Sequence, residues 1–231
     1  MSRSRPSIDV SAHLIESAPV PGPILARLAS PAGAVDAALP PVDFAEFFGN
    51  DHPVELEVGS GKGLFLANAA RANPGRNYLG VEIAKKYARL AAERLARQGI
   101  ANAKVWAADI REVLGRRIPA QSLRAVHVYF PDPWWKKRHR KRRVFTAELL
   151  AQIARTLQPG GELLVASDVE EYFGLIRELI AASPAFHERP TPEVKQPEHP
   201  LDYLTNFERK YRLEGRPVYR AEYDYRPAAG S

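Results

Sequence analysis

The stretch Val54-Glu-Leu-Glu-Val-Gly-Ser-Gly-Lys-Gly63 decides the fold of this chain. Its first half is a short β-rich run, and its second half is a turn with a glycine at every second position. A helical pattern follows over residues 64–71 and stops at Asn73-Pro74-Gly75. A strand, a glycine turn and a helix in this order predict the first unit of an α/β domain.

The same alternation continues from this stretch towards the C-terminus. β-Rich runs recur at residues 78–82, 104–108, 125–130 and 162–167, and helical patterns at residues 84–98, 144–157 and 169–182. Residues 218–225 alternate as in an edge strand, whereas residues 184–200, rich in proline and charge, predict a long loop. We therefore expect a mostly parallel sheet with helices on both faces.

Residues 1–50 differ in composition from the rest. Prolines are scattered among alanine, serine and glycine without a sustained apolar period, which predicts a partly ordered N-terminal extension. The aromatic patch at residues 44–48 is expected to anchor this extension to the body. Residues 51–231 are expected to form a single domain.

The composition excludes several classes of protein. With 231 residues and 45% hydrophobic content, the chain is long enough for a sizeable core. No apolar run approaches the ~18 residues of a membrane helix, and residues 1–10 lack a secretory signal. The chain has no cysteine, and its six histidines form no metal-binding pattern, so we expect no disulfide and no metal site. These features are typical of a cytoplasmic protein.

The positive charge is concentrated in one segment. The formal net charge is +6, and residues 136–143 carry seven lysines and arginines without an acidic residue among them. Such a segment raises the local density of a polyanion and favours binding to a phosphate backbone. The alternative is a solvated helix face or a segment that only aids solubility, but the segment lacks the i, i+4 acidic partners of a salt-bridged surface helix.

Three acidic residues lie at successive strand ends. Glu57 precedes the glycines, Glu82 ends the second β-rich run and Asp109 follows the third. Glu82 is placed to accept hydrogen bonds from both hydroxyls of a ribose, and Asp109 to meet an adenine amine or a neighbouring polar group. Glu57 is placed to orient the loop or to meet an ammonium group.

Taken singly, each of these acids would be interpreted as a solvated loop residue or a helix cap. Together, at the edge where ligands of doubly wound sheets bind, they favour a cationic nucleoside cofactor. The turn has the spacing Gly-x-Gly-x-Gly and not that of a dinucleotide fold, and it lacks the Lys-Ser/Thr ending of a phosphate loop. S-adenosylmethionine carries a sulfonium, an ammonium group and a ribose but no phosphate, and it fits this set.

The segment Phe130-Pro-Asp-Pro-Trp-Trp135 is the most unusual part of the chain. Its two prolines restrict the backbone and are expected to hold Asp132 in a fixed position. An indole of Trp134 or Trp135 is placed to stack on a base, and the basic segment follows directly. A core strand capped by proline, with tryptophans packed beneath it, is the alternative, but it does not explain the adjacent positive charge.

With these motifs in this order, the chain resembles the bacterial tRNA (guanine-N7)-methyltransferases, which act on the guanosine at position 46 of the tRNA variable loop. The resemblance covers residues 54–225. The motifs that carry it are Leu-Glu-Val-Gly-Ser-Gly-Lys-Gly (56–63), Gly-Val-Glu (80–82), Ala-Asp (108–109), Phe-Pro-Asp-Pro-Trp (130–134), Lys-Arg-His-Arg-Lys-Arg-Arg (137–143), Ala-Ser-Asp (166–168) and Thr-Asn-Phe-Glu (205–208).

The resemblance implies a class I methyltransferase fold that depends on S-adenosylmethionine. This is a Rossmann-like sheet of seven mostly parallel strands with helices on both faces and an antiparallel last strand. Residues 51–231 would be a single methyltransferase domain, with tRNA as its partner. Family members are monomers or homodimers, so the resemblance leaves the oligomeric state open.

The resemblance also implies roles for individual residues. The cofactor would lie against Glu57, Gly59, Gly61, Glu82, Asp109 and Asp132, with Asp132 as the catalytic residue. The substrate guanosine and its surroundings would contact Lys136, Asp168, Thr205, Asn206, Phe207 and Glu208. The tRNA backbone would contact Arg138, Arg140, Lys141, Arg142 and Arg143.

Three other functions remain open from the residues. A nicotinamide-dependent dehydrogenase is disfavoured by the short glycine spacing and the number of acids. An RNA-binding module without catalysis would not require the set of pocket carboxylates. A methyltransferase that acts on another RNA is distinguished only by the resemblance.

Overall fold

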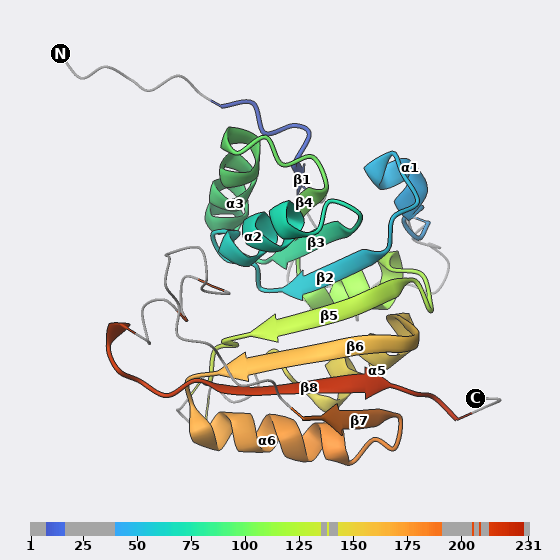
Figure 1. The fold of residues 1–231 in the computed structure, drawn as a ribbon, viewed down its shortest axis with the longest axis vertical. Coiled ribbons are helices and arrows are strands. Elements are labelled where there is room, and N and C mark those ends of the chain that lie inside the picture. The colour runs from blue at the N-terminus through green and yellow to red at the C-terminus, as the bar shows by residue number, and fades with distance from the viewer. Residues whose placement is uncertain are drawn as a thin grey trace, which may run out of the picture.

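The computed structural model describes residues 8–16, 40–134, 138, 143–190, 205, 208 and 213–228. Within these residues the strands form one sheet with the order β1-β4-β3-β2-β5-β6-β8-β7 (Figure 1). The strands are β1 (Leu14–Glu16), β2 (Val54–Val58), β3 (Asn77–Glu82), β4 (Ala103–Ala107), β5 (Leu123–Tyr129), β6 (Leu157–Ser167), β7 (Phe186–Arg189) and β8 (Tyr219–Tyr225). The helices are α1 (Phe44–Phe48), α2 (Leu64–Ala72), α3 (Lys85–Arg97), α4 (Ile110–Glu112), a π-helical turn at Val113–Arg117, α5 (Ala147–Thr156) and α6 (Glu170–Ala181).

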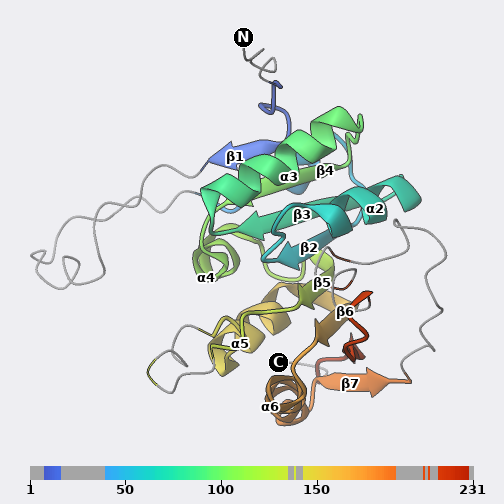
Figure 2. The ribbon, with the colours of Figure 1, turned by 90° about the vertical axis from the view of Figure 1, so that its left-hand side faces the viewer.

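The sheet has a core on each face. Helices α2 and α3 pack with β3 and β4 on one face, whereas α5 and α6 pack on the other, against β2, β5 and β6. Figure 2 shows α2 on the opposite side of the sheet from α4 and α5. This two-sided cover confirms the predicted α/β class, and it explains why β2 and β3 are buried along their whole length.

The prediction of seven strands is wrong by one. Leu14–Glu16 pairs in parallel with residues 105–107 of β4 and adds an eighth strand. Without β1, strand β4 would expose a row of unpaired backbone groups at the edge of the sheet. Part of the N-terminal extension thus completes the sheet.

The opposite edge also differs from the prediction. Residues 218–225 were expected to form an edge strand, but β8 lies inside the sheet, antiparallel to β6 and to β7. The loop predicted over residues 184–200 includes β7, whose Phe186 packs against Tyr225 with ring centroids 5.2 Å apart. Residues 191–200 of that predicted loop lie outside the described residues. A four-residue strand among prolines and charges has too short an alternation to stand out in sequence.

The aromatic patch at residues 44–48 forms α1 and packs against the core, as expected. The Asp43 carboxylate accepts hydrogen bonds from the backbone N–H of Ala45 and Glu46 at the start of the helix. The Phe47 ring stacks on Trp106 of β4 with centroids 6.3 Å apart. Lys104 donates a 2.6 Å hydrogen bond from Nζ to the Phe47 carbonyl.

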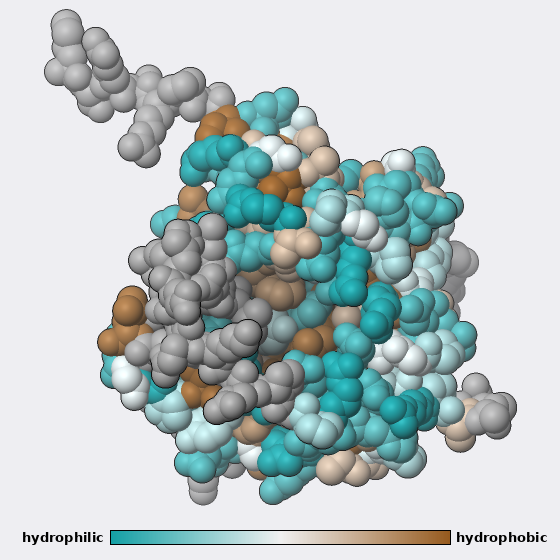
Figure 3. Space-filling view, viewed as in Figure 1, coloured by the Kyte–Doolittle hydropathy of each residue, from teal (hydrophilic) through white to brown (hydrophobic). Residues whose placement is uncertain are grey.

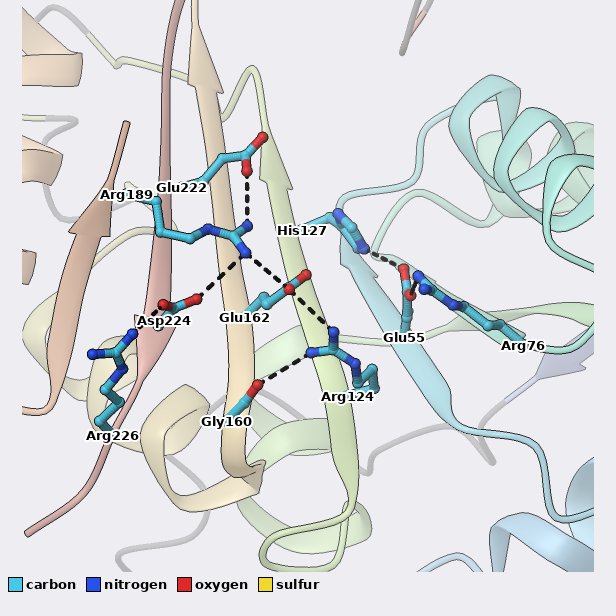
Figure 4. Close-up of polar contacts among 10 residues, drawn as sticks. All are labelled: Glu55, Arg76, Arg124, His127, Gly160, Glu162, Arg189, Glu222, Asp224 and Arg226. Atoms are coloured by element: carbon cyan, nitrogen blue, oxygen red, sulfur yellow. Dashed lines mark hydrogen bonds and ion pairs between the residues drawn. The ribbon is translucent and has the colours of Figure 1, made fainter. Parts of the chain in front are cut away.

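Part of the sheet face that carries α2 and α3 holds a network of ion pairs over β5, β6 and β8 (Figure 4). Arg189 lies at its centre, 3.0 Å from Glu162, 2.8 Å from Glu222 and 3.4 Å from Asp224. Arg124 joins it through Glu162 at 3.1 Å. In the space-filling view of this face, hydrophilic residues predominate over the right-hand part of β6 and β8 (Figure 3).

Among the described residues, none of the helices is long and apolar enough to cross a membrane. In the same part of the chain, no three histidine, aspartate or glutamate side chains are grouped so as to hold a metal ion.

Candidate active site

The strand order places a topological switch point between β2 and β5. From β2 the chain proceeds outward through β3 to β4, and it then returns to β5, which pairs with the other side of β2. In open α/β sheets, ligands bind outside the carboxyl ends of the strands at such a point. The glycine loop follows β2 and the Pro131–Trp134 loop follows β5, so both predicted elements flank the switch point.

The glycine loop has a backbone that only glycine adopts readily. Gly59, Gly61 and Gly63 have φ angles of 72°, 52° and 68°. Gly63 also lies against α3, where an added Cβ would be 2.8 Å from the Cβ of Ala91. The alternating glycines thus allow both the turn and the close packing of α2 on α3.

Glu82 fixes this loop from the end of β3. Its Oε2 accepts a 2.9 Å hydrogen bond from the Gly61 N–H, and its Oε1 accepts one of 2.8 Å from the Ala84 N–H. Each carboxylate oxygen keeps a second acceptor position. Glu82 therefore retains the capacity to accept hydrogen bonds from the two hydroxyls of a ribose, and that role remains a prediction.

Glu57 is buried beside the loop, with 3% of its surface exposed. Its Oε2 has no hydrogen-bond partner within the described part of the chain. Burial, together with the nearby charge of Glu82, raises the pKa of this carboxyl well above its usual value. A buried acid without a partner fits the ammonium group of S-adenosylmethionine, which would supply both a donor and a positive charge.

Asp109 is largely committed to its neighbour in the chain. It caps α4 and accepts hydrogen bonds from the Arg111 backbone N–H at 2.9 Å and from the guanidinium at 3.1 and 2.7 Å. Burial would raise the pKa of Asp109, but these hydrogen bonds outweigh it and lower the pKa. With three acceptor positions in use, about one remains for an adenine amine.

The Pro131–Trp134 loop is held in an unusual conformation. Phe130 and Trp134, which flank its Pro-Asp-Pro turn, have φ angles of 51° and 43°, in the left-handed region that non-glycine residues rarely adopt. The Phe130 N–H donates a 2.8 Å hydrogen bond to the Ala166 carbonyl of β6. Such outliers persist where the surrounding structure fixes them, and they cluster at functional sites.

Arg143 and Tyr172 support this loop from the other side. Arg143 donates a 2.8 Å hydrogen bond from Nε to the Pro133 carbonyl, and its guanidinium lies 4.7 Å from the centre of the Tyr172 ring. Burial is the main cause of the raised pKa of Tyr172, and the charge of Asp132 adds to the rise. Asp132 is thus close to Tyr172 while remaining exposed to solvent, where a substrate can reach it.

The substrate residues predicted near the end of the sheet are held by arginines. Asp168, directly after β6, forms an ion pair with Arg216. Glu208 forms an ion pair with Arg220 of β8, and its backbone N–H donates a 3.0 Å hydrogen bond to Thr205 Oγ1. Glu208 is almost fully buried, whereas Asp168 is partly exposed.

The remaining predicted residues divide into two groups. Arg138 is described and exposed to solvent. Outside the described residues lie Trp135, Lys136, Arg140, Lys141, Arg142, Asn206 and Phe207.

A network of hydrogen-bonded, buried polar side chains lies beneath the site, and the sequence analysis did not predict it. His127 of β5 contacts Tyr129 Oη through Nδ1 and Glu55 Oε2 through Nε2, each at 2.9 Å. The Glu55 carboxylate also forms an ion pair with Arg76, with Oε1 2.7 Å from the guanidinium nitrogen Nη1 (Figure 4). Burial would raise the pKa of Glu55, but the hydrogen bonds and charges of His127 and Arg76 outweigh it and lower the pKa. The sequence signal for this network was the presence of polar residues at alternating positions in otherwise buried strands.

Comparisons with known proteins show the family to which this chain is related. The family model described as "Putative methyltransferase" matches residues 51–221. The tRNA (guanine-N(7)-)-methyltransferase of Rhodopirellula baltica is 50% identical over 182 residues, covering 76% of this chain and 67% of that protein. The enzyme of the same name from Geobacter metallireducens is 36% identical over 183 residues, covering 79% and 87%.

A solved structure supports the fold independently. The 16S rRNA methyltransferase KamB superposes with a TM-score of 0.58 at 21% identity, covering 80% of this chain and 93% of that chain. At this level of identity the likeness shows the fold alone. Fold and site together define a class I methyltransferase that uses S-adenosylmethionine. Within that class, the chain belongs to the tRNA (guanine-N7)-methyltransferase family.

Proposed function

We propose that this chain transfers the methyl group of S-adenosylmethionine to N7 of a guanine in tRNA, and that this guanine is at position 46 of the variable loop. The observation that carries the proposal is the placement of the glycine loop and the Pro131–Trp134 loop on β2 and β5, which are neighbours at the switch point. The activity in the names of the related enzymes supports the choice of acceptor.

The cofactor side of the site is built from acids. S-adenosylmethionine, when bound, supplies a methyl group on a positively charged sulfur. Glu57 would receive the ammonium group, and Glu82 would accept hydrogen bonds from the ribose while holding the glycine loop. Two carboxylates so close together favour a cationic ligand over a pyrophosphate.

The acceptor side requires little acid–base chemistry. Guanine N7 has a lone pair and no proton at neutral pH, so the protein needs no general base to generate the nucleophile. Methylation at N7 would leave a positive charge on the purine. Asp132 would accept a hydrogen bond from the guanine edge and stabilise that charge, with Asp168 or Glu208 as helpers. Alignment of the two reactants can contribute ~7–11 kcal/mol to lowering the barrier.

The RNA must also present its base to this edge of the sheet. N7 lies in the deep, narrow major groove of A-form RNA, so the guanosine must be unstacked or extruded. Trp134 or Trp135 would stack on a base, and the basic segment 136–143 would hold the neighbouring phosphates. We place this reaction in the cytoplasm, with its tRNA substrate.

Nucleoside analysis of methylated tRNA tests the proposal. Bulk tRNA incubated with the purified protein and labelled S-adenosylmethionine should yield labelled 7-methylguanosine, mapped to one position. A tRNA transcript with adenosine at position 46 should take up no label. Label in a different nucleoside would show a methyltransferase for another target, and tRNA binding without label would show a binding module.

A further inference from the structure

Two arginines near the C-terminus, Arg216 just before β8 and Arg220 within it, lie beside the site. Because β8 is antiparallel to β6, its beginning lies beside the end of β6, with Tyr219 paired to Ser167 and Arg220 to Ala166. Asp168 follows β6 directly, so the start of β8 and the residues before it face the predicted guanosine site. Neither the motifs nor the resemblance assigned a role to Arg216 or Arg220.

Arg220 holds the segment that carries the Thr205–Glu208 motif. Its guanidinium donates to Glu208 Oε1, and the two side chains are 18% and 2% exposed. Thr205 accepts the backbone N–H of the same Glu208. Arg220 therefore ties both described residues of this motif to the sheet.

Arg220 also lies close to the cofactor side. Arg220 of β8 pairs with Ala166 of β6, which in turn pairs with Tyr129 of β5. The three residues therefore lie in a row on the same face of the sheet. Burial raises the pKa of Tyr129, the charge of Glu57 raises it further and the charge of Arg220 lowers it. Arg220 is thus placed between the substrate motif and the end of β5, where the Pro131–Trp134 loop begins.

Arg216 contacts the second acid of the predicted substrate set. Its guanidinium donates to Asp168 Oδ2, and the Asp168 side chain is 11% exposed against 42% for Arg216. Glu214 lies 3.8 Å from the other end of the guanidinium. The exposed arginine thus fixes the direction of a largely covered carboxylate.

We propose that Arg216 and Arg220 are positioning residues for the guanosine: Arg216 orients Asp168, and Arg220 orients Glu208 with its segment. Neither touches the reacting atoms. This inference rests on the proposed function, because it takes Asp168 and the Thr205–Glu208 motif as the guanosine contacts.

Strand β8 supplies a matched control. Arg226, just beyond its other end, forms an ion pair with Asp224 at 2.8 Å and is well exposed. Arg216→Gln and Arg220→Gln should each lower kcat/KM for tRNA by about 10- to 100-fold, because a charged hydrogen bond that orients a contact is lost. Arg226→Gln should leave kcat/KM unchanged, and calorimetry should show wild-type affinity for S-adenosylmethionine in all three variants.

Double variants separate positioning from general support of the fold. If Arg220 acts through Glu208, adding Arg220→Gln to Glu208→Gln should cause no further loss, and the same should hold for Arg216→Gln on Asp168→Asn. Arg220→Lys should recover part of the activity, since it keeps the charge. Additive losses, or a parallel loss of cofactor affinity, would overturn the proposal.

Two further results keep the test decisive. Arg216 lies on the surface, so Arg216→Gln carries the test even where Arg220→Gln fails to fold. A wild-type protein that does not methylate tRNA would refute the proposed function itself. An active wild type with fully active Arg216→Gln would refute only the positioning role.

Discussion

At the scale of single residues, the buried Glu57 carboxyl makes the ligand-free protein sensitive to pH. Its raised folded-state pKa means that the native chain retains a proton that the unfolded chain releases above the usual value of 4.5. The free energy of unfolding attributable to Glu57 therefore falls as pH rises from that value until the folded pKa is passed. Wild type should therefore lose Tm relative to Glu57→Gln as the pH is raised from 4.5 through neutral pH.

Thermal melts of both proteins across this range measure the difference. Saturating S-adenosylmethionine should reduce it, because the ammonium group would give the ionised carboxylate a partner. Parallel pH profiles of the two ligand-free proteins would contradict the assignment of Glu57 as a buried, unpaired acid.

Asp132 carries the chemical prediction at this scale. Asp132→Asn removes the negative charge that would stabilise the methylated purine, so turnover at saturating cofactor should fall by about 10²- to 10³-fold. Asp51→Asn, at an exposed acid ahead of β2, is the matched control and should keep wild-type turnover. Near wild-type turnover of Asp132→Asn would remove Asp132 from the mechanism.

At the scale of elements, the start of α2 depends on Gly63. Gly63→Ala forces a Cβ into contact with Ala91 at a φ of 68°, so the free energy of unfolding should fall by about 1–3 kcal/mol. Gly75 has open space around it and no left-handed φ, so Gly75→Ala should change the free energy of unfolding by less than about 0.5 kcal/mol. Urea titration of both variants measures their free energies of unfolding. Equal values for the two variants would argue against the close packing of α2 on α3.

The loop after β5 depends on the side chain of Arg143. Arg143→Lys keeps the positive charge but loses the planar Nε donor to the Pro133 carbonyl. If Arg143 fixes the loop, kcat should fall several-fold while the salt dependence of KM for tRNA stays the same. Unchanged kcat with weaker tRNA binding would instead return Arg143 to the RNA-backbone role that the sequence suggested.

Elements with several turns or long alternation were predictable, and very short ones were not. The strands from β2 to β6 and the helices α2, α3, α5 and α6 each repeat their apolar period enough times to be read locally. The three-residue β1 and the four-residue β7 depend on pairing with β4 and β8, which a local pattern does not encode.

The site shows the same division. Glu57 and Glu82 lie at the ends of β2 and β3, and Asp109 and Asp132 follow β4 and β5, so their common edge follows from the alternation of strands and helices. The arginines that hold the other two acids are distant from them in sequence: Arg216 lies 48 residues from Asp168, and Arg220 lies 12 residues from Glu208. Only the antiparallel placement of β8 brings them together with the site.

At the scale of the whole molecule, the distribution of charge predicts how tRNA binding responds to salt. Each phosphate contact that is lost should reduce the slope of log affinity against log salt concentration by about 0.7 to 0.9. Arg140→Gln with Arg142→Gln should reduce the slope by about twice that amount. Arg97→Gln, on the exposed face of α3 and paired with Glu93, should leave it unchanged. If the double variant kept the slope of the wild type, the basic segment 136–143 would be excluded as the phosphate contact.

Cofactor and guanosine should meet at the switch point between β2 and β5. The most direct test is a structure of the protein with tRNA and a non-reactive cofactor analogue. We predict that the acceptor guanine lies between the glycine loop and Asp132, with N7 about 3–3.5 Å from the position of the transferable carbon. A guanine bound away from Asp132, or an analogue bound away from the glycine loop, would contradict the account.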